Sequence, residues 1–404
     1  MSVQSQSPDE SGNDNEKLAD NNETVQRKRS AQEKKTQGKT LGSGRLMALD
    51  AVRGLAVIGM FLQHFAVSNE RTAFVAGNTT LLFVLCGGIS YSIMAQRMKE
   101  RGTDASIFRS KMLARAVFVD VIGYLLIMLN TPYGIILPAY AAMFVFGLVL
   151  VHRSTRVLVY TTVALLLLAP PLMILGMSYL SGAYLLKDIA GGPMSALALA
   201  PAFVAGMTIA RFNLTSKRIA MTLAIAGFIM LVIGKLLGTY VLPDLTISFE
   251  SWLVSISDLS QTPPDEYAIW PLNITPPQMW HMLLQTAPHT ASTFQTLNGL
   301  GLAFLVLGLA FLIPRKISVL LTPFAAVGRV ALTMYAAQFV IVWVLTILGI
   351  DYDLSWIPLN DVLVMFITLL IGSIIARMPN GPLESMMRRF DRIFSSFGPT
   401  STSK

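Results

Sequence analysis

The 404-residue chain is 53% hydrophobic and only 13% charged. Because soluble domains carry about 25% charged residues, this composition excludes an ordinary soluble domain and predicts an integral membrane protein. The single cysteine, Cys86, excludes an intrachain disulfide and a cysteine-based metal site. The four histidines are scattered along the chain and form no zinc motif, so we predict no metal and no permanently bound cofactor.

Residues 1–44 are polar and contain too few apolar side chains to form a core. We therefore expect a disordered cytoplasmic tail. Its basic cluster "RKRSAQEKK", residues 27–35, favours contact with anionic membrane lipid over nucleic acid.

Ten apolar windows follow, and a lipid-spanning helix needs roughly 20 residues of this kind. The windows lack the period-2 alternation of a membrane β-barrel, so the predicted fold is all-α, with ten transmembrane helices in residues 45–378 and a cytoplasmic tail at 379–404. The windows are 46–67, 73–95, 113–130, 134–151, 156–176, 190–210, 218–238, 292–313, 322–348 and 357–376.

In this layout, loops rich in lysine and arginine alternate along the chain with loops that contain almost none. With the N-terminus in the cytoplasm, the inner segments hold 26 of the 31 basic residues and the outer segments hold two, Arg71 and Lys187. The positive-inside rule therefore predicts that both termini are cytoplasmic. The basic tail carries no lysosomal or mitochondrial address, which favours the plasma membrane of a bacterium.

One predicted outer loop, residues 239–291, differs from the others. It contains no lysine or arginine, five acidic residues, seven prolines and three of the five tryptophans. A loop of this length is usually functional, and its aromatic rings could stack on sugars. An interfacial tryptophan belt explains the same pattern, and both interpretations stay open.

The first window contains a polar stripe within "DAVRGLAVIGMFLQH", residues 50–64. On a helix, Arg53 and His64 project from one face about 16 Å apart, and Asp50 is placed to pair with Arg53. Charged groups in a span cost about 2.5–3.5 kcal/mol and need a partner or a hydrated cavity. Either the pair and the histidine only fix helix packing, or the stripe lines a wet passage in which His64 accepts protons.

These residues also carry a resemblance. "RLMALDAVRGLAVIGMFLQHF" resembles the first helix of the transmembrane acyltransferase superfamily, with the Arg-x10-His spacing of the bacterial O-acyltransferase family three, and "LLFVLCGGISYSIM" resembles its second helix. Further along, "APHTASTFQTLNGLGLAFLVLGLAFLI", "PFAAVGRVALTMYAAQFVI" and "GPLESMMRRF" are similar to bacterial relatives of heparan-alpha-glucosaminide N-acetyltransferase. The resemblance covers residues 45–392.

The resemblance implies acyl transfer across the bilayer, from cytoplasmic acyl-CoA, above all acetyl-CoA, to a hydroxyl or amine of an envelope glycan or glycolipid. We assign His64 as general base or acyl carrier and His289 as second acid/base or acceptor ligand. Arg53, Arg115 and Arg329 are the candidates for the CoA phosphates. The lysosomal enzymes place their histidine in the first luminal loop, whereas loop 68–78 here has none.

A different class of protein fits part of the pattern. A multi-pass transporter or lipid flippase would also have a polar interior, although it is expected to show broken helices in paired positions. The sequence leaves the oligomeric state open.

Overall fold

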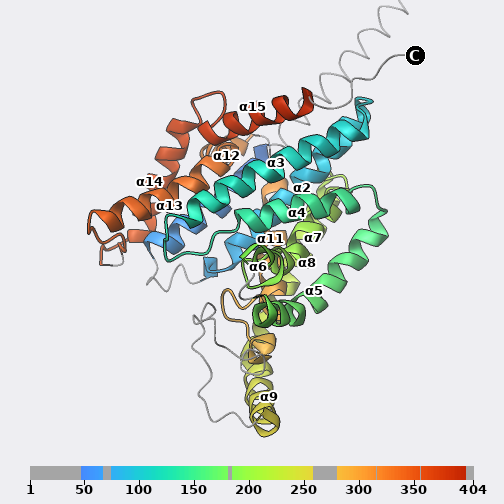
Figure 1. Ribbon diagram of the computed structural model, residues 1–404, viewed down its shortest axis with the longest axis vertical. Coiled ribbons are helices and arrows are strands. Elements are labelled where there is room, and N and C mark those ends of the chain that lie inside the picture. Colours follow the sequence, from blue (N-terminus) through green and yellow to red (C-terminus); the bar gives the residue numbers. More distant parts are fainter. Residues whose placement is uncertain are drawn as a thin grey trace, which may run out of the picture. The chain divides into compact units, whose positions relative to one another are not determined.

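Every regular element in the described part of the chain is a helix (Figure 1). The computed structural model describes residues 47–66, 74–180, 184–257, 280–314, 316–354 and 356–396. The predicted all-α class is therefore confirmed for these residues. The predicted disordered tail, residues 1–44, lies outside them.

The described residues form helices with the following bounds, in chain order. The first helix is Met47–Phe65. It is followed by α2 (Asn78–Glu100), α3 (Ala105–Ile127), α4 (Leu137–Leu150), α5 (Thr155–Tyr179), α6 (Tyr184–Ala190), α7 (Ala196–Ile209), α8 (Lys217–Tyr240), α9 (Leu242–Ser257), η2 (Trp280–Leu284), α11 (Thr293–Leu312), η3 (Ser318–Leu321), α12 (Thr322–Arg329), α13 (Ala331–Ile347), α14 (Asn360–Ile375) and α15 (Pro382–Ser396).

Five helices are long and apolar enough to cross a membrane: the first helix, α2, α5, α8 and α11. A sixth candidate consists of η3 and α12 together with α13, which meet at an angle of 66°. Helices α4, α7 and α14 are apolar but have only 14 to 16 residues, and α3 carries four charged side chains. Each of the ten predicted windows contains a helix, but ten spans and the orientation of the termini stay predictions.

Helix α2 lies at the centre and α8 at the periphery. About 72% of the apolar window of α2 is buried, against 22% for α8. Small residues allow α2 to approach α7 closely, because a Cβ on Gly88 would lie 2.0 Å from the Phe203 carbonyl oxygen. Helix packing in membranes commonly uses such small residues, whereas the exposed apolar side chains of α8 suit contact with lipid.

The first helix packs closely against α12. A Cβ on Gly54 would lie 2.0 Å from the Phe324 carbonyl oxygen, and one on Gly328 would lie 1.7 Å from that of Asp50. Only glycine fits at these two positions, so the backbones touch. This contact brings the bend between α12 and α13 beside the polar stripe of the first helix.

Residues 382–396, part of the predicted C-terminal tail, form α15, which runs along α3 and also contacts α13 (Figure 1). Leu383, Met387 and Phe390 recur at helical spacing and pack on the core. Arg388 and Arg389 lie on the exposed side. An amphipathic pattern of this kind stabilises a helix through its one buried face. The prediction of a C-terminal tail did not include this helix.

Residues 242–257, part of the predicted outer loop 239–291, form helix α9. Pro243 is tolerated because it lies in the first turn, where its missing N–H has no helical partner. Asp244 in the same turn interacts favourably with the helix dipole. The prediction that residues 239–291 form a loop is therefore wrong for residues 242–257. The segment that carries five of the seven prolines, residues 258–279, lies outside the described residues.

Candidate functional site

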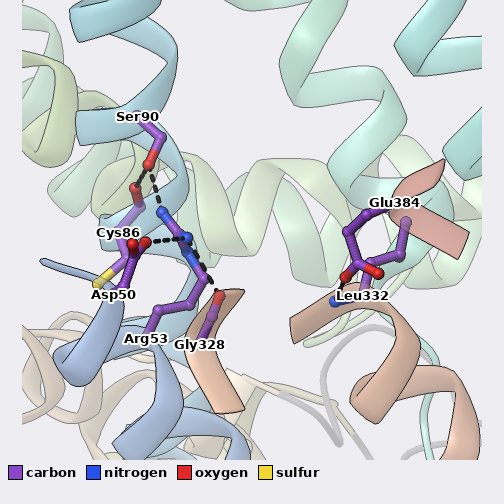
Figure 2. A network of polar contacts seen from close by, with 7 residues as sticks. All are labelled: Asp50, Arg53, Cys86, Ser90, Gly328, Leu332 and Glu384. Atoms are coloured by element: carbon purple, nitrogen blue, oxygen red, sulfur yellow. Dashed lines mark hydrogen bonds and ion pairs between the residues drawn. The ribbon is translucent and has the colours of Figure 1, made fainter. Parts of the chain in front are cut away.

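Arg53 is the centre of a polar cluster between the first helix, α2 and α12 (Figure 2). Its Nη1 lies 2.9 Å from Asp50 Oδ1 and also donates to the Gly328 carbonyl at 3.3 Å. Its Nη2 donates to Ser90 Oγ at 2.5 Å, and Ser90 in turn donates to the Cys86 carbonyl. The predicted Asp50–Arg53 pair is thus present, and it joins three helices.

The cluster is not sealed, since the Arg53 and Asp50 side chains are 20% and 25% exposed. Arg329 acts electrostatically on Asp50, and its Nη2 donates to the Ala376 carbonyl at the end of α14. Two of the three predicted phosphate-binding arginines therefore share this region. Arg329 is the exposed one, which leaves its guanidinium open to a ligand.

The third arginine, Arg115, has a different environment. Its Nε and Nη2 lie 2.9 and 2.8 Å from Asp391 Oδ2 on α15, and its Nη1 faces the Met94 sulfur. The Asp391 side chain is only 6% exposed. Arg115 therefore links α3 to α15, and this contact uses much of its donor capacity.

His64 is buried at the other end of the polar stripe. Its ring stacks on Tyr133, with centroids 3.8 Å apart and planes 16° from parallel, and meets the edge of Phe339. The Tyr133 hydroxyl donates to the His64 carbonyl at 2.9 Å. The imidazole Nδ1 is buried and has no hydrogen-bond partner among the described residues. A buried polar atom without a partner is unusual and calls for an explanation.

The second predicted catalytic histidine, His289, lies in the same region of the bundle as His64. His289 precedes α11 in a backbone conformation with φ 62° and is close enough to His64 for their imidazoles to interact electrostatically. Desolvation lowers the pKa of His289. His289 and Gln295 line a cavity of about 10 Å³, which is room for about one water.

A cavity of about 340 Å³ lies at the same end of the bundle. Tyr133 lines it, so one residue contacts both the cavity and His64. Met194 lines this cavity and the small one at His289. The polar lining consists of Asn130, Thr131, Lys187, Asp188 and Ser195. Mixed donors and acceptors of this kind suit a polyhydroxylated ligand.

Sequence reasoning missed two residues of these clusters, Ser90 and Tyr133, and one further buried polar residue, Gln338. Ser90 lies in a helix segment of small residues and Tyr133 in a short loop. Neither sequence context indicates a functional residue. Gln338 on α13 is fully buried, and neither amide atom has a partner among the described residues. An amide in an otherwise apolar helix is a signal that could have identified it.

The helices and buried polar clusters define a multi-pass, all-α membrane protein. Residues 267–393 match the model of a family described as a protein of unknown function, DUF418. No curated protein matches the chain. The match includes His289 and Arg329 but not the first two helices. Because the description of this family names no activity, the likeness of the chain to acyltransferases rests on the quoted motifs alone.

Proposed function

We propose that this protein is a membrane-embedded acyltransferase in the plasma membrane of a bacterium, with ten spans and cytoplasmic termini. It moves an acyl group, above all acetyl, from cytoplasmic acyl-CoA to a hydroxyl or amine of an envelope glycan or glycolipid. The observation that carries the proposal is the stacking of His64 on Tyr133, a residue that also lines the 340 Å³ cavity.

The cavity supports the assignment of an acceptor site. It adjoins His64 through Tyr133, and its polar lining suits hydroxyl groups of a sugar. A neutral imidazole is the side chain best suited to accept a proton from such a group near neutral pH. Tyr133 covers His64, so its ring must move for the acceptor to reach the base.

The proposed reaction has balanced bonds and protons. Nδ1 of His64 takes the proton of the acceptor hydroxyl or amine as its oxygen or nitrogen attacks the thioester carbonyl. The carbon–sulfur bond breaks, the acyl group stays on the acceptor, and the thiolate of CoA leaves. The imidazolium then returns its proton to that thiolate, and His289 assists the exchange.

The acyl-CoA donor approaches from the end of the polar stripe that carries Arg53, opposite to His64. Arg53 is held by three acceptors and mainly fixes the helices. Arg329 is exposed and donates to the Ala376 carbonyl, and its remaining donors can meet a phosphate. Arg115 is held by Asp391 and contributes to the electrostatic field of the inner mouth.

The test is transfer of radiolabel from acetyl-CoA into lipid or glycan by membranes that contain the protein. His64→Gln should abolish transfer at unchanged protein level, because glutamine cannot accept the proton. His281→Gln, a second buried histidine outside the cavities, is the control and should retain transfer. Full transfer by the His64 variant would refute the role of this histidine.

The second candidate is a transporter or lipid flippase, and one observation favours it. The 66° bend between α12 and α13 resembles the discontinuous helices that line transport sites. Movement of an unmodified lipid or glycan in reconstituted vesicles, with no label transferred, would support this class over the transferase.

A further inference from the structure

A separate cavity of about 140 Å³ lies at the end of α2 opposite to the histidines. It is bordered by α2, the end of α4 and the turn after α7. Its polar lining is Ser92, Gln96, Lys99, His152 and Arg211. The lining thus contains two permanent cations and no carboxylate, so its electrostatic potential favours an anion.

Two donors of this cavity have no partner among the described residues. Ser92 is fully buried, and its hydroxyl makes no hydrogen bond. The Nε of Arg211 is also buried without a partner. Because buried polar groups are normally hydrogen-bonded, these donors indicate that something absent from the polypeptide binds here.

The side chains around the cavity are fixed by the ends of neighbouring helices. Arg211 Nη2 donates to the Val151 carbonyl after α4. Gln96 Nε2 donates to the Ala210 carbonyl after α7 at 3.5 Å. These contacts hold the guanidinium at the cavity wall before any ligand arrives, which reduces the entropy lost on binding.

We propose that this cavity binds the phosphate group of a larger ligand, with Arg211, Lys99 and Ser92 as donors. Its volume is below the roughly 300–1,000 Å³ of sites that enclose a whole small molecule, so it accepts one phosphate rather than a complete nucleotide. Arginine and lysine are the usual partners of phosphate. The group belongs either to a soluble phosphate compound such as CoA or to a phospholipid headgroup.

The inference goes beyond the proposed function, which assigns phosphate contacts to other arginines, and it does not require acyl transfer. A competing explanation is that Lys99 and Arg211 only neutralise the carbonyl ends of α2, α4 and α7. That explanation predicts no phosphate binding that depends on these side chains, so a binding measurement separates the two.

The experiment uses the full chain purified in a maltoside detergent, which contains no phosphate. Isothermal titration measures binding of inorganic phosphate and of adenosine 3′,5′-bisphosphate, and native mass spectrometry measures retention of added phosphatidylglycerol. Lys99→Gln and Arg211→Lys should each weaken binding about tenfold or more, and Ser92→Ala by less. Lys217→Gln makes the same charge change as Lys99→Gln at an exposed position outside the cavity and should bind like the wild type.

Binding of the bisphosphate that is weakened by these variants assigns a soluble ligand, and variant-sensitive retention of phosphatidylglycerol alone assigns a lipid headgroup. The proposal is overturned if the wild type, Lys99→Gln and Arg211→Lys bind each of the three probes equally. It is also overturned if the wild type binds none of the three probes. Arg211→Lys keeps the charge, so its melting temperature serves as the check that the fold persists. Loss of acyl transfer with intact phosphate binding would refute only the proposed function.

Discussion

The ring of Tyr133 lies on the imidazole of His64, with centroids 3.8 Å apart, while its hydroxyl bonds to the carbonyl of the same residue. Tyr133 also lines the 340 Å³ cavity. It is thus held to His64 at two points and borders the space where a ligand fits. Burial raises the pKa of Tyr133, which keeps the phenol neutral and able to donate.

Tyr133→Ala should expose His64 to the cavity, because it removes the covering ring. We expect modification of His64 by diethyl pyrocarbonate, followed by mass spectrometry, to become severalfold faster. Tyr133→Phe keeps the ring and should react at nearly the wild-type rate. Equal rates for the alanine variant and the wild type would show that another side chain covers His64.

Breaking the Asp50–Arg53 pair on one side should destabilise the protein more than removing both partners. Arg53→Met leaves Asp50 without its closest partner, and loss of one member of a buried pair costs about 3–5 kcal/mol. Because both side chains are partly exposed, we expect about 1–3 kcal/mol.

The measurement is the thermal unfolding of Arg53→Met, Asp50→Asn and the double variant in detergent. The double variant should be more stable than the sum of the two single effects predicts. The difference is the coupling energy between Asp50 and Arg53 in this double-mutant cycle. Arg97→Gln, an exposed arginine on α2, is the control and should change the midpoint little. Strict additivity would mean that the pair contributes nothing.

The sequence was sufficient for contacts between close neighbours on one helix. Asp50 and Arg53 are three residues apart, so helical geometry alone places them together. Their partners Ser90 and Gly328 lie on other helices, and only the glycine contact between the first helix and α12 brings them near. Hydrophobic windows located helices for the same reason, since apolar length is a local property.

Long-range relationships were not predictable in this way. That His289 lies in the region of His64 depends on how α11 packs against the rest of the bundle. The basic inner mouth predicts that Arg115 binds phosphate, but Arg115 pairs with Asp391 on α15, which lies within the predicted C-terminal tail. In each case the missing information was tertiary packing and not residue type.

Glu384→Gln should loosen the start of α13. The Glu384 carboxylate accepts from the Leu332 amide at 2.8 Å (Figure 2). It also accepts from the Thr333 amide at 3.1 Å and from the Thr333 hydroxyl. It therefore satisfies amides that the bend leaves without helical partners, and its charge suits the helix N-terminus. We expect a loss of about 1–2 kcal/mol.

Hydrogen exchange at the Leu332 and Thr333 amides provides the direct readout, and it should accelerate in Glu384→Gln. Glu100→Gln changes an exposed glutamate at the end of α2 and should leave these amides unchanged. Unchanged protection in the Glu384 variant would show that the carboxylate is dispensable for the bend.

Acidification should destabilise the protein in part through His289. Desolvation lowers the pKa of His289 from 6.5 in the folded state, so the folded protein binds fewer protons than the unfolded chain at mildly acidic pH. The contribution of His289 to the free energy of unfolding is therefore fully present above pH 6.5 and is lost as the pH falls below that value.

The unfolding midpoint in detergent, measured from pH 7.5 to 5.5, should fall less steeply for His289→Gln than for the wild type. Parallel curves for the wild type and His289→Gln would mean that the folded state accommodates the charged imidazole of His289.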